Sequence, residues 1–174
     1  NYTNQLILTG QLDDVGDPKR INVPSSYRAG IELSAGWRIS PLFDWTGNLT
    51  YSQNKIKEFT AYVDDWSTGL QQAVVYQNTN IAYSPDVIAS QELVMHVLKD
   101  KGNRLKSDLD IAFVGKHIGK QFIDNTSNAH RQLDEYTVFD LRVDYRIRTS
   151  FLKELGLYAN VQNLLATEYV SNAW

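Results

Sequence analysis

The stretch YRAGIELSAGWRI, residues 27–39, alternates strictly between two kinds of side chain. Its odd-numbered positions are mostly apolar: Tyr27, Ala29, Ile31, Leu33, Ala35, Trp37 and Ile39. Its even-numbered positions are charged or small: Arg28, Gly30, Glu32, Ser34, Gly36 and Arg38. Successive side chains of a β-strand point to opposite faces of the sheet. The period of two therefore predicts a long strand with one apolar and one polar face.

The same alternation recurs and predicts seven strands, near residues 2–9, 27–39, 43–57, 87–98, 105–122, 137–148 and 155–161. Three long polar connections (residues 10–25, 58–85 and 123–135) take turns with three short ones, near residues 39–42, 99–103 and 149–153. An antiparallel up-and-down meander places alternate connections at opposite ends of its sheet. All three long connections are therefore expected at one end.

Short turns on one side, long loops on the other and strands with one apolar face are together typical of an outer-membrane β-barrel. We therefore predict an all-β fold, a partial transmembrane β-barrel of about seven strands. Its lipid-facing set is expected to include Ile31, Leu33, Trp37, Leu49, Leu141, Val143 and Val161, and its lumen-facing set Glu32, Arg142 and Asp144. A soluble all-β binding module with one solvated face remains the alternative.

Composition excludes several other classes of protein. A net charge of -3 over 174 residues argues against a nucleic-acid partner. The absence of cysteine removes disulfides and thiolate chemistry. His96, His117 and His130 lie apart from one another and from any catalytic or metal-binding motif. We therefore predict no enzymatic activity, no cofactor and no metal site.

Ligand recognition, if this chain carries it, belongs to the long connections, because loops commonly hold binding residues. Two groups there mix aromatic and polar side chains: Tyr62, Asp64, Asp65 and Trp66 in the longest connection, and Asn125, Asn128, His130 and Arg131 in the next. The alternative for each of them is an ordinary solvated loop residue.

Several segments together carry a family resemblance: YTNQLILTG (2–10), SYRAGIEL (26–33), WTGNLTYS (45–52), VGK (114–116) with DNTSN (124–128), and NVQNLL (160–165) leading to Glu168 and Tyr169. In this order and spacing the chain resembles the C-terminal part of the barrel of a TonB-dependent outer-membrane receptor, of the type common in Bacteroidetes. The resemblance covers essentially all of residues 1–174.

That resemblance implies a place in the bacterial outer membrane and TonB-energised uptake of a siderophore, haem, cobalamin or an oligomeric nutrient. It implies outer-membrane lipid and periplasmic TonB as partners, with a surface lipoprotein as an optional third. TonB would act through a plug domain, and no segment here matches one. We expect residues 1–174 to be a barrel segment without the plug and final strand, with Trp174 in the last external loop. A passive porin is a further alternative.

Overall fold

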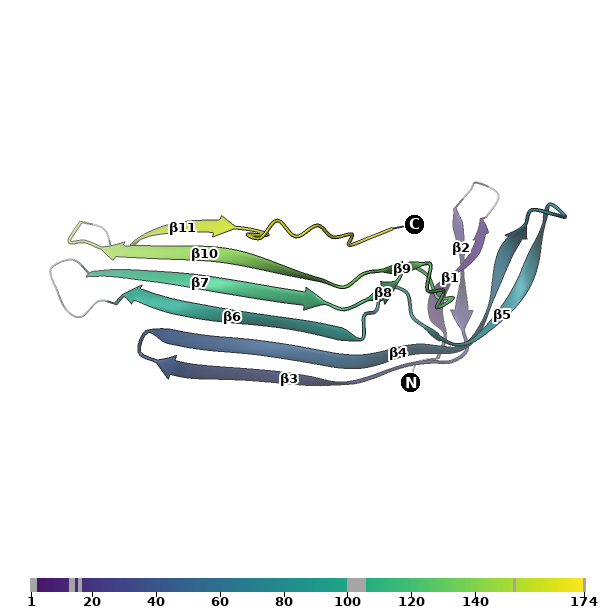
Figure 1. Ribbon diagram of the computed structural model, residues 1–174, viewed down its shortest axis with the longest axis horizontal. Coiled ribbons are helices and arrows are strands. Elements are labelled where there is room, and N and C mark those ends of the chain that lie inside the picture. Colours follow the sequence, from purple (N-terminus) through teal and green to yellow (C-terminus); the bar gives the residue numbers. More distant parts are fainter. Residues whose placement is uncertain (1–2, 13–14, 16, 100–105, 152, 174) are drawn as a thin grey trace.

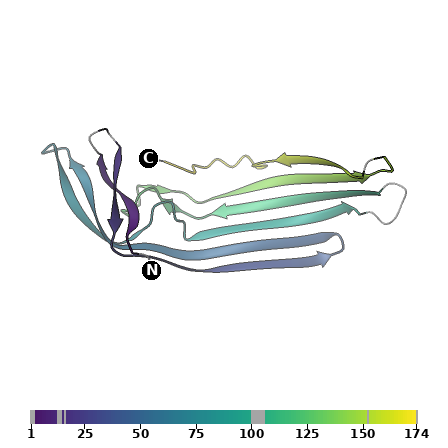
Figure 2. The same cartoon turned by 180° about the vertical axis from the view of Figure 1, so that it is seen from behind.

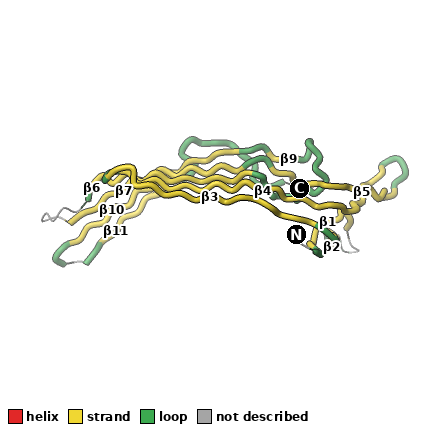
Figure 3. Tube along the Cα trace, turned by 90° about the horizontal axis from the view of Figure 1, so that it is seen from below, coloured by secondary structure: helices red, strands yellow, loops and turns green. Residues whose placement is uncertain are grey.

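The computed structural model describes residues 3–12, 15, 17–99, 106–151 and 153–173. These residues form strands, turns and loops without a helix, as the trace in Figure 3 shows. The strands are β1 (Gln5–Leu12), β2 (Pro18–Val23), β3 (Ser26–Ser40), β4 (Phe43–Asp65), β5 (Leu70–Asn80), β6 (Val87–Leu98), β7 (Lys106–Ile118), β8 (Gln121–Phe122), β9 (Gln132–Leu133), β10 (Tyr136–Arg148) and β11 (Leu155–Val161).

One antiparallel sheet dominates the molecule, with the strand order β11-β10-β7-β6-β4-β3 (Figure 1). The chain passes through this path in order, but β5 comes between β4 and β6, and β8 and β9 come between β7 and β10. β5 pairs with Lys55–Asp65 of β4 and is the seventh strand of the sheet. The predicted all-β, seven-stranded antiparallel sheet is confirmed. The sheet is not closed, and β3 and β11 are the edges of its path among the described residues.

The connections divide between the two ends of the sheet as predicted. Figure 1 shows the turn between β3 and β4 at one end, which we call the turn end. The β1–β2 hairpin, the β4–β5 hairpin and the β8–β9 segment lie together at the other, the loop end. The other two predicted short turns, and the position of Trp174, fall wholly or partly outside the described residues.

The prediction that residues 2–9 form a strand of the main sheet is wrong. β1 pairs with β2, and the two form a separate sheet within the described part of the chain. Figure 2 shows this hairpin rising away from the plane of the long strands. Its residues alternate as wall strands do, but β2 lies inside the stretch expected to be a polar connection. β1 therefore pairs with β2, the strand that follows it directly in the chain.

The longest predicted connection is also largely strand. β4 continues to Asp65 and returns through β5, so residues 58–80 build a hairpin that overhangs the sheet. The strand observed in the predicted range 105–122 is shorter than predicted. β7 ends at Ile118, and the chain then enters the small two-stranded sheet of β8 and β9.

A compact apolar cluster joins the two hairpins at the loop end. It consists of Ile7 of β1, Val23 of β2 and four residues of the β4–β5 region: Ile56, Phe59, Ala61 and Ile81. Ile56 and Val23 are fully buried, and the ring of Phe59 stacks on Tyr76 at 5.4 Å. This burial holds β1–β2 against β4 and gives the loop end a core of its own.

Candidate functional site

The two faces of the main sheet differ sharply in chemistry. Strand register places one apolar row across it, composed of Trp37, Trp45, Leu93, Phe113, Leu141 and Val161. The apolar residues predicted to share a face do so, and Glu32, Arg142 and Asp144 lie on the opposite one. On the apolar face Leu33 and Trp37 are 60% and 65% exposed, so no other part of the described chain covers them.

A chain of alternating charges crosses the polar face near the turn end. Arg38 of β3 donates from Nε to Asp44 of β4 at 3.1 Å. His96 of β6 lies between two carboxylates, with Nε2 2.9 Å from Asp44 and Nδ1 2.6 Å from Asp110 of β7. Arg146 of β10 then donates to the other oxygen of Asp110 at 2.9 Å. These four contacts therefore connect each pair of neighbouring strands from β3 to β10.

A second group of ion pairs continues this lattice. Arg142 of β10 contacts Glu92 of β6 at 3.2 Å and Asp144 on its own strand at 3.1 Å. Arg148 contacts Asp108 of β7 at 3.0 Å and Glu154 at 3.1 Å, just before β11. Opposite charges on neighbouring strands stabilise a sheet face, and the Arg142–Glu92 pair reaches across β7, which lies between β6 and β10. The polar face therefore carries a network of ion pairs that connects its strands.

Asp110→Ala should reveal how much this lattice contributes to stability. The change removes the acceptor that His96 and Arg146 share, and hydrogen bonds to charged groups contribute about 1.5–3 kcal/mol each. We expect a loss of about that size in total, because the site is partly open to solvent. Chemical denaturation of the complete protein measures it. Asp64→Ala, at the exposed hairpin tip, is the control and should cost less than about 0.5 kcal/mol; equal losses would show that the lattice adds nothing.

A shallow hollow lies on the polar face beside this lattice. Its volume is about 520 Å³, and its polar lining includes Ser34, Thr46, Asn48, Ser90 and Glu92. Hydroxyl, amide and carboxylate groups are the partners that a hydrophilic solute uses. This part of the face therefore offers hydrogen bonds without a strong net charge.

The first predicted ligand group lies at the tip of the β4–β5 hairpin. Trp66 is 92% exposed there, and Asp64 accepts a hydrogen bond from Gln71 at 2.8 Å. Asp65 has a structural role in the turn: it accepts from the backbone and hydroxyl of Ser67, from Thr68 and from Gln72. The Ser67 and Thr68 hydrogen bonds lower the pKa of Asp65 to about 2, so the carboxylate stays charged above that pH.

The second predicted group lies in the segment between β8 and β9, at the base of the hairpin. Asn125 is buried and its Oδ1 accepts from the backbone of Ala82 at 2.8 Å. Asn128 accepts from the backbone of His130 at 2.9 Å, and Arg131 pairs with Asp124 at 2.8 Å. Most of these side chains therefore order the segment, while the His130 residue is exposed.

The structure does not bring the two groups into one site. The β5 strand, Leu70–Asn80, separates the hairpin tip from the segment that Asn125 anchors. Its 11 residues correspond to about 35 Å at about 3.3 Å per residue. A small ligand cannot touch both groups at once in this arrangement.

The interpretation of the histidines needs a correction. His96 is not isolated, because it joins two carboxylates from neighbouring strands. The alternation that places Leu93, Met95 and Val97 on the apolar face already puts His96 on the polar one, and this signal could have found it. His117 lies on the apolar face instead and contacts the hydroxyl of Thr137 at 2.9 Å.

Among the described residues, no helix is both long enough and apolar enough to span a membrane. The same residues contain no group of three or more His, Asp or Glu side chains placed to hold a metal ion. Compared with known protein families, residues 1–164 match the family described as TonB dependent receptor-like, beta-barrel. No curated protein matches the chain.

Proposed function

Because the chain belongs to the TonB-dependent receptor β-barrel family, whose members are transport receptors of the bacterial outer membrane, we propose that it forms a wall section and external loops for TonB-energised uptake. The cargo class we propose is a siderophore, haem, cobalamin or an oligomeric nutrient. The observation that supports this role is the pairing of an uncovered apolar face with a charged face. In an outer-membrane barrel the apolar face contacts lipid, and the charged face lines the water-filled lumen.

In this proposal the loop end faces the outside of the cell and the turn end faces the periplasm, because outer-membrane barrels have long external loops and short periplasmic turns. The exposed Trp66 at the tip of the β4–β5 hairpin would meet ligand first, together with Tyr62, Asp64 and Asp65. The segment containing Asn125, Asn128, His130 and Arg131 would make a second, separate contact. A plug absent from these residues would couple the barrel to TonB.

Growth tests on the complete receptor examine the transport role. Cells that depend on this receptor would be supplied in turn with ferric siderophores, haemin, cobalamin or oligosaccharides as the limiting nutrient. We expect growth on one class, and loss of that growth when TonB is deleted. Growth that persists without TonB would favour a passive porin, and a receptor found in the soluble fraction would favour a binding module.

Trp66→Ala tests the external contact separately. Removing an exposed aromatic anchor from a binding surface should weaken ligand binding to whole cells about tenfold, which corresponds to about 1.4 kcal/mol. Phe151→Ala is the matched control, because Phe151 is equally exposed, at 92%, but lies beyond β10 at the turn end. Equal binding by the two variants would remove Trp66 from the proposed site.

A further inference from the structure

The imidazole of His96 has a carboxylate at both of its nitrogens. Nε2 lies 2.9 Å from an oxygen of Asp44 on β4, and Nδ1 lies 2.6 Å from an oxygen of Asp110 on β7. The His96 side chain is 14% exposed, so these two carboxylates are the main polar partners of the ring. The two contacts together decide which protonation state of the ring fits the site.

A neutral imidazole does not fit between two ionised carboxylates. It carries one N–H, so its second nitrogen would present a lone pair to an oxygen that is itself an acceptor. The doubly protonated imidazolium instead donates from both nitrogens. Both contacts of His96 are as short as hydrogen bonds from a cationic nitrogen to a carboxylate, which are about 2.7–2.9 Å long. The geometry therefore requires a second proton in this part of the sheet.

That proton belongs to the ring and not to a carboxylate, because each carboxylate also faces an arginine. The other oxygen of Asp44 accepts from Arg38 at 3.1 Å, and the other oxygen of Asp110 accepts from Arg146 at 2.9 Å. Arginine stays charged in proteins, and it favours the ionised form of a carboxylate beside it. The row from β3 to β10 therefore alternates in charge, with the imidazolium of His96 at its centre.

Further charged groups near this row do not change that balance. Asp144 of β10 stands opposite Asp110 in the register and pairs with Arg142 at 3.1 Å, so its charge is already matched. Lys99, exposed just after β6, adds a like charge near His96. Water and salt screen an exposed ammonium, whereas both carboxylates are in hydrogen-bond contact with the ring.

The backbone around His96 also holds the ring in place. Its N–H donates to the carbonyl of Leu42 in the β3–β4 turn at 2.8 Å. The register of β6 with β7 shifts between His96 and Leu98, and such irregularities bend a strand and re-aim its side chains. His96 therefore links three strands at the point where the regular pairing of β6 with β7 is interrupted.

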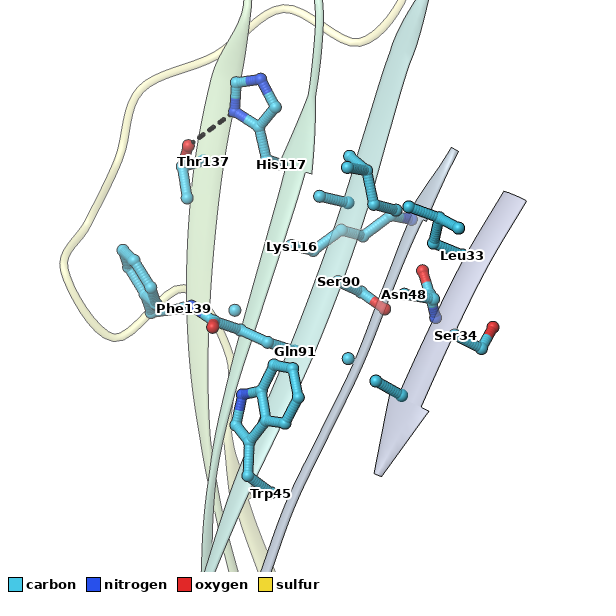
Figure 4. Close-up of a pocket in the computed structure, with 15 residues that line it drawn as sticks. Leu33, Ser34, Trp45, Asn48, Ser90, Gln91, Lys116, His117, Thr137 and Phe139 are labelled. Atoms are coloured by element: carbon cyan, nitrogen blue, oxygen red, sulfur yellow. Dashed lines mark hydrogen bonds between the residues drawn. The ribbon is translucent and has the colours of Figure 1, made fainter. Parts of the chain in front are cut away.

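His117 of β7 provides a contrast within the same sheet. Figure 4 shows its ring directed at Thr137, with Nδ1 2.9 Å from the hydroxyl oxygen. A hydroxyl can donate as well as accept, so a neutral ring satisfies this contact in either tautomer. The need for a second proton is therefore a property of the His96 site.

We propose that His96 is a proton-dependent lock in the lumen wall. With both nitrogens protonated, its ring connects β4 to β7 through β6 near the turn end. When one proton is lost, a nitrogen lone pair faces a carboxylate and that connection is broken. The wall near the turn end then becomes more negative and is held less firmly. The lock rests on the proposed function in one respect, since a water-filled lumen supplies and accepts the proton.

The pH dependence of folding stability tests the lock in the complete receptor. A site that binds one proton more in the folded state makes the folding constant fall by up to about tenfold per pH unit as the pH rises. A free imidazole is charged below about pH 6.5, so His96 should add no slope below that pH and a decline above it. Denaturant titration in lipid vesicles, from mildly acidic to mildly alkaline pH, measures this decline.

Two substitutions isolate the contribution of His96. Asp44→Asn replaces one carboxylate by an amide of the same shape that can donate to Nε2, so a neutral ring fits and the decline should be absent. His96→Lys keeps a positive charge that is not lost in this pH range, so its stability should not decline either. His130→Gln, at an exposed histidine, is the control and should keep the full decline.

A wild-type decline no steeper than that of Asp44→Asn would overturn the proposal, because the proton would then not depend on the second carboxylate. This comparison does not need His96→Lys to fold, since wild type and Asp44→Asn are sufficient for it. The readout is stability and not uptake. Failure of the lock would therefore leave the growth tests unaffected and is distinguishable from failure of the transport role.

Discussion

Leu33→Arg is expected to destabilise the folded barrel by about 2–4 kcal/mol, the cost of an arginine that faces lipid near the bilayer midplane. Leu33 is 60% exposed on the apolar face and pairs with Leu49 of β4. No carboxylate of this face lies beside it in the register, so the guanidinium would have neither water nor a counter-ion.

Ser34→Arg is the matched control for this change. Ser34 is the next residue of the same strand, and it pairs with Asn48 on the polar face. A guanidinium there remains hydrated in the lumen, so we expect a change within about 0.5 kcal/mol. Denaturant titration of the complete receptor in lipid vesicles compares the two variants. Equal losses would contradict the assignment of the faces and would support a soluble core.

Residues 1–174 produced by themselves should not form a monomeric barrel. The described sheet ends at β3 on one side and β11 on the other, and both edges present unpaired backbone N–H and C=O groups. Open edges template association with other chains, and hydrocarbon does not tolerate them. The large apolar face has no core to enter, so aggregation or oligomerisation is the expected outcome.

Size-exclusion chromatography with light scattering measures this outcome, with and without detergent. The complete receptor is the control, and it should elute as a defined species in detergent. A monodisperse, detergent-free segment that melts cooperatively as a monomer would contradict the prediction. In that case a soluble all-β binding module would explain the two-faced strands better than a barrel wall does.

The ion pairs on the polar face could not be predicted from the sequence, although the face of each charged residue could. Alternation placed Asp110 and Arg146 on one face, but nothing local indicated that they share an ion pair across 36 positions of sequence. His96 reaches Asp44 across 52 positions. Such pairs depend on the register between strands, and register is a property of the folded sheet.

The arrangement of the loop end could not be predicted from the sequence either. The pattern of β1 resembles that of a wall strand, yet burial of Ile7 and Val23 against Ile56 and Phe59 places it in a separate hairpin. The two candidate ligand groups looked equivalent in composition. Pairing of β4 with β5 places the group around Trp66 at the tip of the hairpin, whereas the group around Asn125 lies at its base.

The sequence by itself determined the strand type, the two faces and the end at which each described connection lies. These properties depend on a period of two and on connection lengths, which are local and readable along the chain. Only the tertiary structure decided which charges meet and which strand leaves the main sheet. Those outcomes depend on contacts between segments far apart in the chain, because burial and register are settled only when the strands pair.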